Sequence, residues 1–323
     1  MSADVDVGRG TRPSPRPHRQ GTSRLLVYAG WVAGCIVVVS SLVAAVRTES
    51  RMSVGDAVFL GVVEGVTEYL PVSSTGHLTV AERLLGIGDD PVEKKAADSF
   101  TIVIQAGAIA AVALLYRQRL GQMIGSLRTG DEDHRRLGFA VLLAAVPAGV
   151  VGLVFGDVLK QHLLGVGPVA VAWFFGGVAI LALPRMSGRA DGRLEDLQPR
   201  AALSIGVAQV LALWPGVSRS LVTILAATAF GLSPAAAVEF SFLLGLVTLG
   251  AATAWEALRH GSDMVSQLGV GTVLAGFATS TVSAALSVQW LVSYLRRRSL
   301  TVFGWYRIVA ACIAATLLIT GAL

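Results

Sequence analysis

The chain has 323 residues, of which 54% are hydrophobic and only 15% are charged, and its mean hydropathy is +0.66. A water-soluble chain of this length needs more charged side chains to cover its surface. The composition therefore excludes most soluble enzyme folds and indicates a polytopic membrane protein. The net charge of +5 does not indicate nucleic acid, because 24 of the 26 Lys and Arg residues lie in tails, loops or span ends, where bilayer orientation explains them.

The first two regions in chain order precede the main part of the protein. Residues 1–24 are rich in Arg, Pro, Gly and Ser and have no apolar periodicity, so we expect a disordered basic tail on the cytoplasmic side. Residues 25–46 carry no charge and are long enough to cross a bilayer as a helix. A cleaved signal peptide is the alternative, but this apolar stretch is longer than such peptides require. We therefore predict an uncleaved N-terminal anchor.

Six further apolar segments are long enough to be transmembrane helices, at about residues 100–116, 137–155, 168–183, 238–255, 268–291 and 301–320. Two other segments are interrupted, at Pro71 after residues 54–70 and at Pro215 after residues 201–213. Because proline removes a backbone donor and disfavours helix at the preceding residue, each predicts a helix, a break and a second short helix. The expected fold is all-α, with six core helices and the anchor. Cys35 and Cys312 lie in separate spans and predict neither a disulfide nor a metal site.

The two interrupted segments are similar to each other at a constant offset of 145 residues. Gly61-Val-Val-Glu64 matches Gly206-Val-Ala-Gln209, and Ser73-Ser74-Thr75 matches Ser218-Arg219-Ser220. Paired interrupted segments predict an internal repeat with a site at its interface. If both are re-entrant, 17 Lys and Arg residues fall in inside loops and 7 in outside loops, in agreement with the positive-inside rule. The halves, about residues 53–183 and 201–323, are then inverted relative to each other.

Four ionisable side chains are expected at membrane depth, where charge is costly and usually functional: Glu64, Glu68, His77 and Arg219. Glu64 and Glu68 are four residues apart and share one face of a helix. Two adjacent carboxylates need a shared proton, a nearby arginine or a divalent cation. A metal held by both carboxylates and by substrate phosphates would be Mg²⁺ or Ca²⁺. A glutamate pair that faces water at the interface is the alternative.

The residues after each break are typical of a phosphate site. A short helix begins at each break, and its N-terminus offers amide donors and a positive dipole end to an anion. Arg219 adds a guanidinium suited to two phosphate oxygens. The hydroxyl side chains expected to bind phosphate are Ser73, Thr75, Ser218, Ser220 and Thr223. Ser74 and His77 are both candidate nucleophiles, and the sequence does not choose between them.

Three further polar residues, Gln105, Gln209 and Glu239, lie in apolar segments. For the two glutamines we favour hydrogen bonds between helices over a role in the site.

Two stretches of this sequence closely resemble a known family. Glu64-Gly-Val-Thr-Glu68-Tyr-Leu-Pro-Val-Ser73-Ser74-Thr-Gly-His77 resembles the first signature of the bacterial undecaprenyl-diphosphatases, also called bacitracin-resistance proteins. Leu213-Trp-Pro-Gly-Val-Ser218-Arg219-Ser220 resembles the second, and Tyr306-Arg307 is a supporting match. The resemblance runs from about Ser53 to the C-terminus. Leu221 departs from it, since the family usually has glycine there, and Met52 stands near the start of core-length members.

The resemblance implies an enzyme of the bacterial cell membrane that hydrolyses a C55 polyprenyl diphosphate and recycles the lipid carrier of peptidoglycan synthesis. It places the acidic pair at Glu64 and Glu68, and it implies catalytic roles for these two residues and for Ser74, His77 and Arg219. It also implies a site open to the outer side. The sequence leaves the oligomeric state open, with a homodimer among the arrangements considered.

A polyprenyl-phosphate transporter or flippase is the alternative function, because inverted repeats with broken helices are transporter architecture. A transporter needs no nucleophile, so the Ser-Ser-Thr-Gly-His cluster beside two glutamates favours hydrolysis.

Overall fold

The structure is a computed structural model that describes residues 52–87, 91–182, 191–268 and 270–321. All of these belong to one compact unit, Val46–Leu323. The predicted basic tail, the predicted anchor at residues 25–46 and Cys35 lie outside the described residues.

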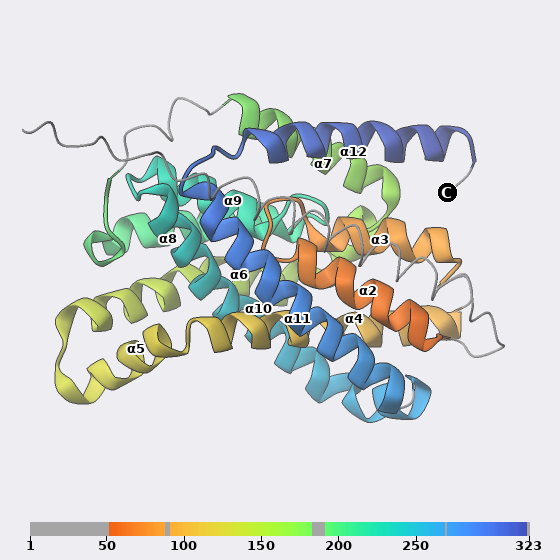
Figure 1. The fold of residues 1–323 in the computed structure, drawn as a ribbon, viewed down its shortest axis with the longest axis horizontal. Helices are drawn as coiled ribbons and strands as arrows, with labels where there is room; N and C mark the ends of the chain where they lie inside the picture. Colours follow the sequence, from red (N-terminus) through yellow and green to blue (C-terminus); the bar gives the residue numbers. More distant parts are fainter. Residues whose placement is uncertain (1–51, 88–90, 183–190, 269, 322–323) are drawn as a thin grey trace, which may run out of the picture. The chain divides into compact units, whose positions relative to one another are not determined.

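Helices are the regular elements of the described residues, and no strand forms among them (Figure 1). The first five are α2 (Val54–Thr67), α3 (Ser74–Leu85), α4 (Pro91–Leu115), α5 (Arg117–Thr129) and α6 (Glu132–Leu163). They are followed by α7 (Val166–Ala182), α8 (Pro199–Gln209), α9 (Arg219–Ala229), α10 (Pro234–Leu268), α11 (Val270–Leu295) and α12 (Thr301–Ile319). Two short 3₁₀ helices, η1 and η2, cover Leu194–Asp196 and Val210–Leu213. The prediction of an all-α fold is confirmed.

Five of these helices, α4, α6, α10, α11 and α12, contain stretches long and apolar enough to cross a membrane. The sixth long span expected from the sequence corresponds to α7, which has 17 residues and is classed with the shorter apolar helices. Seventeen residues is the lower end of what can span the hydrocarbon of a bilayer. The described residues thus support a multi-pass membrane fold with five long candidate spans.

One helix was not anticipated from the sequence. Residues 117–136 separate two of the predicted apolar segments and suggest a loop, but α5 occupies most of that stretch. Gly130 ends α5 with a φ of 75°, and the Asp131 side chain then caps α6 by accepting from the amide of His134. Arg119 on α5 donates to Glu239 of α10 and to Glu195 of η1, both at 2.8 Å. This ion-pair network attaches α5 to the rest of the bundle.

Small residues allow the helix of the first broken segment to pack closely on α11. A Cβ atom added to Gly61 would lie 2.7 Å from the carbonyl oxygen of Gly276, and one added to Gly65 would lie 2.4 Å from that of Ser280. In the second broken segment, a Cβ at Gly206 would lie 2.3 Å from the carbonyl oxygen of Ala144 on α6. Close backbone contact through small residues is typical of helix packing in membranes. The glycines matched in the sequence, Gly61 and Gly206, therefore have the same packing role.

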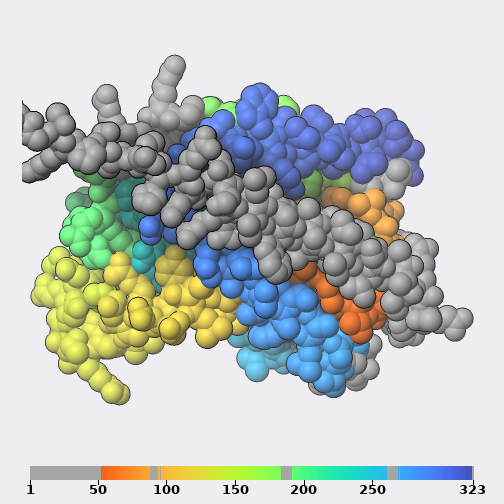
Figure 2. Space-filling model, viewed as in Figure 1, coloured from red at the N-terminus to blue at the C-terminus, as the bar shows by residue number. Residues whose placement is uncertain are grey.

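The last helix, α12, packs beside α7 (Figure 1). A Cβ at Gly177 would lie 2.7 Å from the carbonyl oxygen of Gly304, so this pair is also in close contact. The other side of α12, which includes Val302, Trp305 and Val309, is more than half exposed, and α12 is seen at the surface in Figure 2. An apolar exposed face of this kind suits contact with lipid.

Candidate active site

The first broken segment turns between α2 and α3. α2 ends at Thr67 and α3 begins at Ser74. Ser73, just before α3, has a φ of 75°, a left-handed conformation that is uncommon for residues other than glycine. Its hydroxyl oxygen accepts a hydrogen bond from the amide of Gly76 at 3.4 Å and so caps α3.

The second broken segment has the same local conformation. α8 passes into η2, and α9 begins at Arg219. Ser218 has a φ of 77°, and its hydroxyl oxygen accepts from the amide of Leu221 at 3.3 Å. Among the described residues, Ser73 and Ser218 are the only non-glycine residues with positive φ. Such a conformation costs about 1–3 kcal/mol and is found mainly at functional sites, so both breaks are candidates for one.

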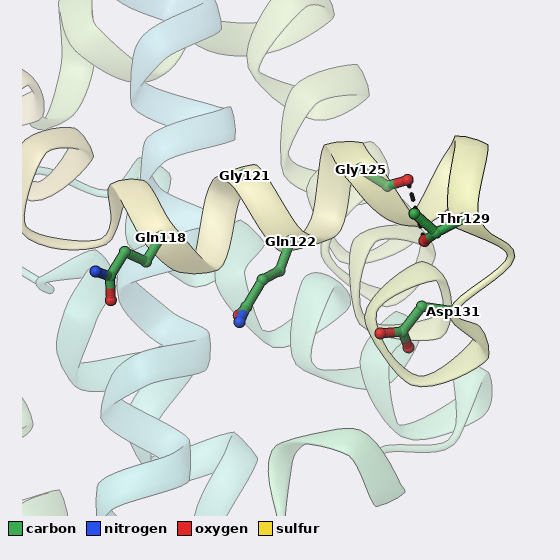
Figure 3. Close-up of a pocket in the computed structure, with 6 residues that line it drawn as sticks. All are labelled: Gln118, Gly121, Gln122, Gly125, Thr129 and Asp131. Carbon is green, nitrogen blue, oxygen red and sulfur yellow. Dashed lines mark hydrogen bonds between the residues drawn. The ribbon is translucent and has the colours of Figure 1, made fainter.

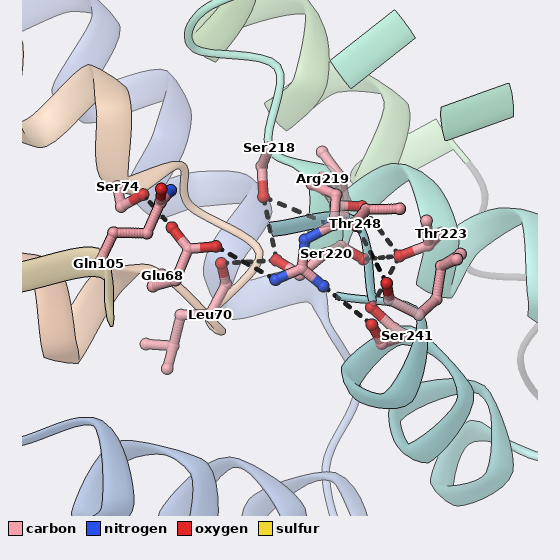
Figure 4. A network of polar contacts seen from close by, with 12 residues as sticks. Glu68, Leu70, Ser74, Gln105, Ser218, Arg219, Ser220, Thr223, Ser241 and Thr248 are labelled. Atoms are coloured by element: carbon pink, nitrogen blue, oxygen red, sulfur yellow. Dashed lines mark hydrogen bonds and ion pairs between the residues drawn. The ribbon is translucent and has the colours of Figure 1, made fainter. Parts of the chain in front are cut away.

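The two breaks are in direct contact with each other (Figure 4). The Ser220 hydroxyl donates to the backbone carbonyl of Leu70 at 2.8 Å. Arg219 Nη2 forms an ion pair with Glu68 Oε1 at 3.1 Å, and these side chains are only 10% and 6% exposed. Residues about 150 positions apart in the sequence thus form one buried polar centre.

Glu68 lies at the middle of this centre. Its Oε1 accepts from Arg219, and its Oε2 accepts a short hydrogen bond from the hydroxyl of Ser74. A buried hydroxyl that donates to a carboxylate is the arrangement of a nucleophile beside its general base. Of the two candidate nucleophiles, Ser74 is the one that has a base in contact.

Arg219 is held from three sides and keeps one donor free. Its Nη1 donates to the carbonyl of Ser241 on α10 at 2.8 Å, and its guanidinium carbon lies 5.3 Å from the centre of the Tyr69 ring. Its Nε is buried and has no hydrogen-bond partner among the described residues. A fixed guanidinium with an unused donor can bind an anion without reorganisation.

Glu64 lies one turn before Glu68 on the same helix and is 1% exposed. It interacts electrostatically with both Glu68 and Arg219. Its Oε1 has no hydrogen-bond partner among the described residues, and neither has Oε1 of Gln209, the residue matched to Glu64 in the second segment. A buried carboxylate oxygen without a partner is costly unless a ligand or cation completes it.

His77 has a partner on each ring nitrogen. Nδ1 lies 2.7 Å from the carbonyl oxygen of Ser73, and Nε2 lies 2.6 Å from the hydroxyl of Tyr306 on α12. Since a carbonyl only accepts, Nδ1 carries the proton and Nε2 accepts from Tyr306. The His77 ring also lies 4.7 Å from the ring of Trp173 on α7. In this arrangement His77 supports the strained backbone at Ser73.

A sequence model of the family described as "Bacitracin resistance protein BacA" matches residues 57–313 of this chain. The chain belongs to the BacA family. It is 43% identical over 258 residues to an undecaprenyl-diphosphatase of Sorangium cellulosum, which covers 78% of this chain and 82% of that protein. It is also 43% identical to undecaprenyl-diphosphatase 1 of Paraburkholderia xenovorans, over 78% of this chain and 90% of that protein. The BacA match includes both breaks and all of the contacts described above.

The remaining hydroxyls expected to bind phosphate differ in their surroundings. Thr75 is exposed at the start of α3. The Ser218 hydroxyl lies 3.1 Å from that of Ser220. Thr223 is fully buried, donates to the Arg219 carbonyl and contacts the Ser241 hydroxyl at 2.7 Å. Thr223 therefore stabilises the start of α9. Contact of Thr75, Ser218, Ser220 and Thr223 with phosphate stays a prediction.

Two polar residues noted in the sequence lie in contacts between helices. Gln105 on α4 accepts from the Thr253 hydroxyl of α10 at 2.8 Å, as expected for a glutamine between two helices. Glu239 is paired with Arg119 in the network around α5.

Several residues of this centre were not singled out from the sequence. Ser241 contributes its backbone carbonyl and its hydroxyl, and Leu70 contributes its backbone carbonyl. Such groups give no signal in the sequence. Tyr306 and Trp173 contact His77 from distant helices. Tyr306 and Arg307 were noted only as a supporting match, although an arginine inside an apolar segment is itself a signal of function.

The acidic residues fit a divalent cation only in part. Both oxygens of Glu68 already accept hydrogen bonds, whereas Glu64 Oε1 has no partner. Among the described residues no group of three or more His, Cys, Asp or Glu side chains gathers. A cation at this site would therefore be held by Glu64 and by phosphate oxygens of the substrate, an arrangement common for Mg²⁺.

A separate surface hollow lies beside α5 (Figure 3). It has a volume of about 510 Å³ and is lined by Gln118, Gly121, Gln122, Gly125, Thr129 and Asp131. None of the residues of the polar centre lines it, and it offers neither a nucleophile next to a base nor a fixed cation. We assign it no role in the chemistry of the BacA site.

The positive φ of Ser73 predicts an unusual order of stability among its variants. Ser73→Ala keeps a Cβ in the left-handed conformation and loses the cap, whereas Ser73→Gly loses the cap but relieves the conformation. We expect the free energy of unfolding in detergent to be about 1–2 kcal/mol lower for Ser73→Ala than for Ser73→Gly.

The control is Ser233, whose hydroxyl oxygen accepts from the amide of Ala236 without a positive φ. The difference between its Ala and Gly variants should be smaller. Equal differences at Ser73 and Ser233 would contradict a strained backbone at the break.

Proposed function

We propose that this chain is an integral membrane phosphatase that hydrolyses undecaprenyl diphosphate to undecaprenyl phosphate and phosphate. By this reaction it would recycle the lipid carrier of peptidoglycan synthesis and contribute to bacitracin resistance. Membership of the BacA family and the similarity to proteins named undecaprenyl-diphosphatase support the substrate. The hydrogen bond from the Ser74 hydroxyl to Glu68, which is itself paired with Arg219, carries the proposal of hydrolysis.

In the proposed mechanism, Ser74 Oγ attacks the terminal phosphorus and its proton passes to Glu68. The bond from phosphorus to the bridging oxygen breaks, and undecaprenyl phosphate leaves. Glu68 releases its proton to water. In the second displacement a water molecule attacks the phosphoserine and gives a proton to Glu68, which passes it to the departing Ser74 Oγ. Ser74 and the Glu68 carboxylate are thereby restored, and phosphate is released.

Arg219 would stabilise the negative charge on the transferring phosphoryl group. The support for this role is its burial, its fixed position and its unpartnered Nε. Donors aimed at developing charge in a site that excludes water are usually the largest contribution to catalysis.

Glu64 is the residue that would hold Mg²⁺ or Ca²⁺. When bound, such a cation neutralises charge on the diphosphate oxygens. The unpartnered Oε1 of Glu64 supports this role.

The proposed arrangement in the membrane is inverted. The first broken segment would enter from outside and the second from inside, with the site open to the outer side. The 145-residue offset, the paired φ values of Ser73 and Ser218, and the excess of basic residues in the loops assigned to the inside support it.

Transport of a polyprenyl phosphate is the second candidate function, because two broken helices that meet at membrane depth are common in transporters. The hydrogen bond between Ser74 and Glu68 favours hydrolysis, since a transporter has no use for a nucleophile with its base.

The first test is enzymatic. Purified protein in detergent should release phosphate from undecaprenyl diphosphate, and EDTA should abolish the release until Mg²⁺ or Ca²⁺ is restored. Ser74→Ala and Arg219→Ala should each lower kcat/KM by about 10³-fold or more, because each removes a group from a buried site. Absence of turnover by folded, lipid-supplied wild-type protein would refute the proposed function. Full turnover in EDTA would refute the proposed requirement for a divalent cation.

The second test separates the two candidate nucleophiles. In a single turnover with substrate labelled on its terminal phosphate, acid quenching should leave label on the protein, since a phosphoserine survives acid. Ser74→Ala should remove the label. Label that is lost in acid but survives base would instead identify a phosphohistidine at His77, and the Ser74 mechanism would be wrong.

The third test concerns orientation, in a background in which Cys35→Ser and Cys312→Ser remove both native cysteines. A cysteine at Lys94, an exposed residue of α4, should react with a membrane-impermeant reagent added to intact cells. A cysteine at Glu132, exposed at the start of α6, should react only after permeabilisation. The reverse pattern would overturn the inverted arrangement.

A further inference from the structure

Arg307 on α12 is the largest fully buried side chain of the described residues. Among the described residues, its guanidinium forms hydrogen bonds only to backbone carbonyl oxygens and forms no ion pair. A buried arginine of this kind is expensive unless its donors are satisfied. Something in the function of the protein must therefore favour an arginine at this position over an apolar residue.

The four carbonyl acceptors come from three different segments. Nη2 donates to Gly216 in the second break and to Ala172 on α7, both at 2.9 Å. Nη1 donates to Pro71 in the first break, and Nε donates to Trp173, both at 3.4 Å. One planar side chain thus spans both breaks and α7.

The acceptors at the breaks are groups that the broken helices leave without a regular helical partner. Pro71 and Gly216 lie between the paired helices, and Gly216 has a φ of 98°. Each precedes a residue of the polar centre by three positions, namely Ser74 and Arg219. If the distance between these two carbonyls is fixed, the position of the Ser74 hydroxyl relative to the Arg219 guanidinium is fixed as well.

The surroundings of Arg307 are shaped to receive it. A Cβ at Gly176 of α7 would lie 2.2 Å from Nη2. The preceding residue, Tyr306, bonds to His77. Two successive residues of α12 therefore contact the first broken segment. Arg307 donates to the Pro71 carbonyl, and Tyr306 donates to His77 of α3.

We propose that Arg307 is a positioning residue that sets the first break against the second and so holds Ser74 and Glu68 in line with Arg219. This inference rests on the proposed phosphatase function. A lysine cannot replace it, because a single ammonium cannot span carbonyls in three segments as a planar guanidinium does. Arg307 itself does not touch the reacting atoms.

Two variants disturb this contact in different ways, and two controls match them. Arg307→Lys shortens the span, and Gly176→Ala displaces the guanidinium while keeping the arginine. Gly167→Ala, on the same helix, meets only Leu318 at 4.0 Å. Leu137→Ala truncates a buried side chain of α6 and controls for lost stability alone.

The measurement is kcat and KM for each protein, per amount of folded, monodisperse protein and well below its melting temperature. Arg307→Lys and Gly176→Ala should lower kcat by about 100-fold, because a misplacement of about 1 Å at the reacting groups has that effect. Their KM values should stay within about threefold of the wild type. Both controls should keep a kcat within about threefold of the wild type, even where the melting temperature falls.

A second readout does not depend on turnover. Spin labels at Thr75, in the first turn of α3, and at Val217, within the second break, should give a broader distance distribution in Gly176→Ala than in Gly167→Ala. Unchanged distances, or kcat losses that only follow the melting temperature as in Leu137→Ala, would overturn the inference. If the wild type fails to turn over substrate but Gly176→Ala still broadens the distances, the proposed function is refuted and the positioning role of Arg307 is not.

Discussion

A helix that breaks in the buried interior of a protein leaves amides and carbonyls that no water can satisfy. This constraint governs the centre of the protein, where Pro71 and Gly216 are both buried. The two breaks satisfy it through each other, through α12 and through local caps. Ser220 donates to the Leu70 carbonyl, and Arg307 donates to carbonyls of both segments. Ser73 and Ser218 cap the helices that follow, at the cost of a left-handed backbone. Carbonyl groups that each break leaves open are thus satisfied by side chains from distant parts of the chain.

The same junction accounts for the buried charges. Glu68 and Arg219 come from different broken segments, and each buried charge would be strongly disfavoured without its partner. Their pairing leaves Glu64 Oε1 and Arg219 Nε without partners, one an acceptor and one a donor. A diphosphate with a divalent cation would supply both missing partners. The polar groups that the fold leaves incomplete therefore correspond to the chemistry proposed for the BacA family member.

Much of this organisation could be predicted from residues close together in the chain. Pro71 and Pro215 predict the breaks, the serines after them predict helix caps, and the isolated charges predict a site at membrane depth. Local signals cannot show which distant groups meet. Nothing near Ser74 in sequence indicates that its base is already bound to Arg219, and nothing near His77 indicates Tyr306. The helix α5 was also missed, because a segment rich in Arg, Gln and Gly resembles a loop in composition.

The sequence by itself determined that this is an all-helical membrane protein of the BacA family with two matched breaks, because hydropathy, proline and short motifs act locally along the chain. Only the tertiary structure decided which side chains share a bond. It pairs Ser74 with Glu68, joins His77 to α12, and places the Arg307 guanidinium between Pro71 and Gly216, which are 145 residues apart. Contacts between residues so far apart in the sequence depend on how the helices pack. Helix packing depends on the shape of whole surfaces rather than on any local pattern.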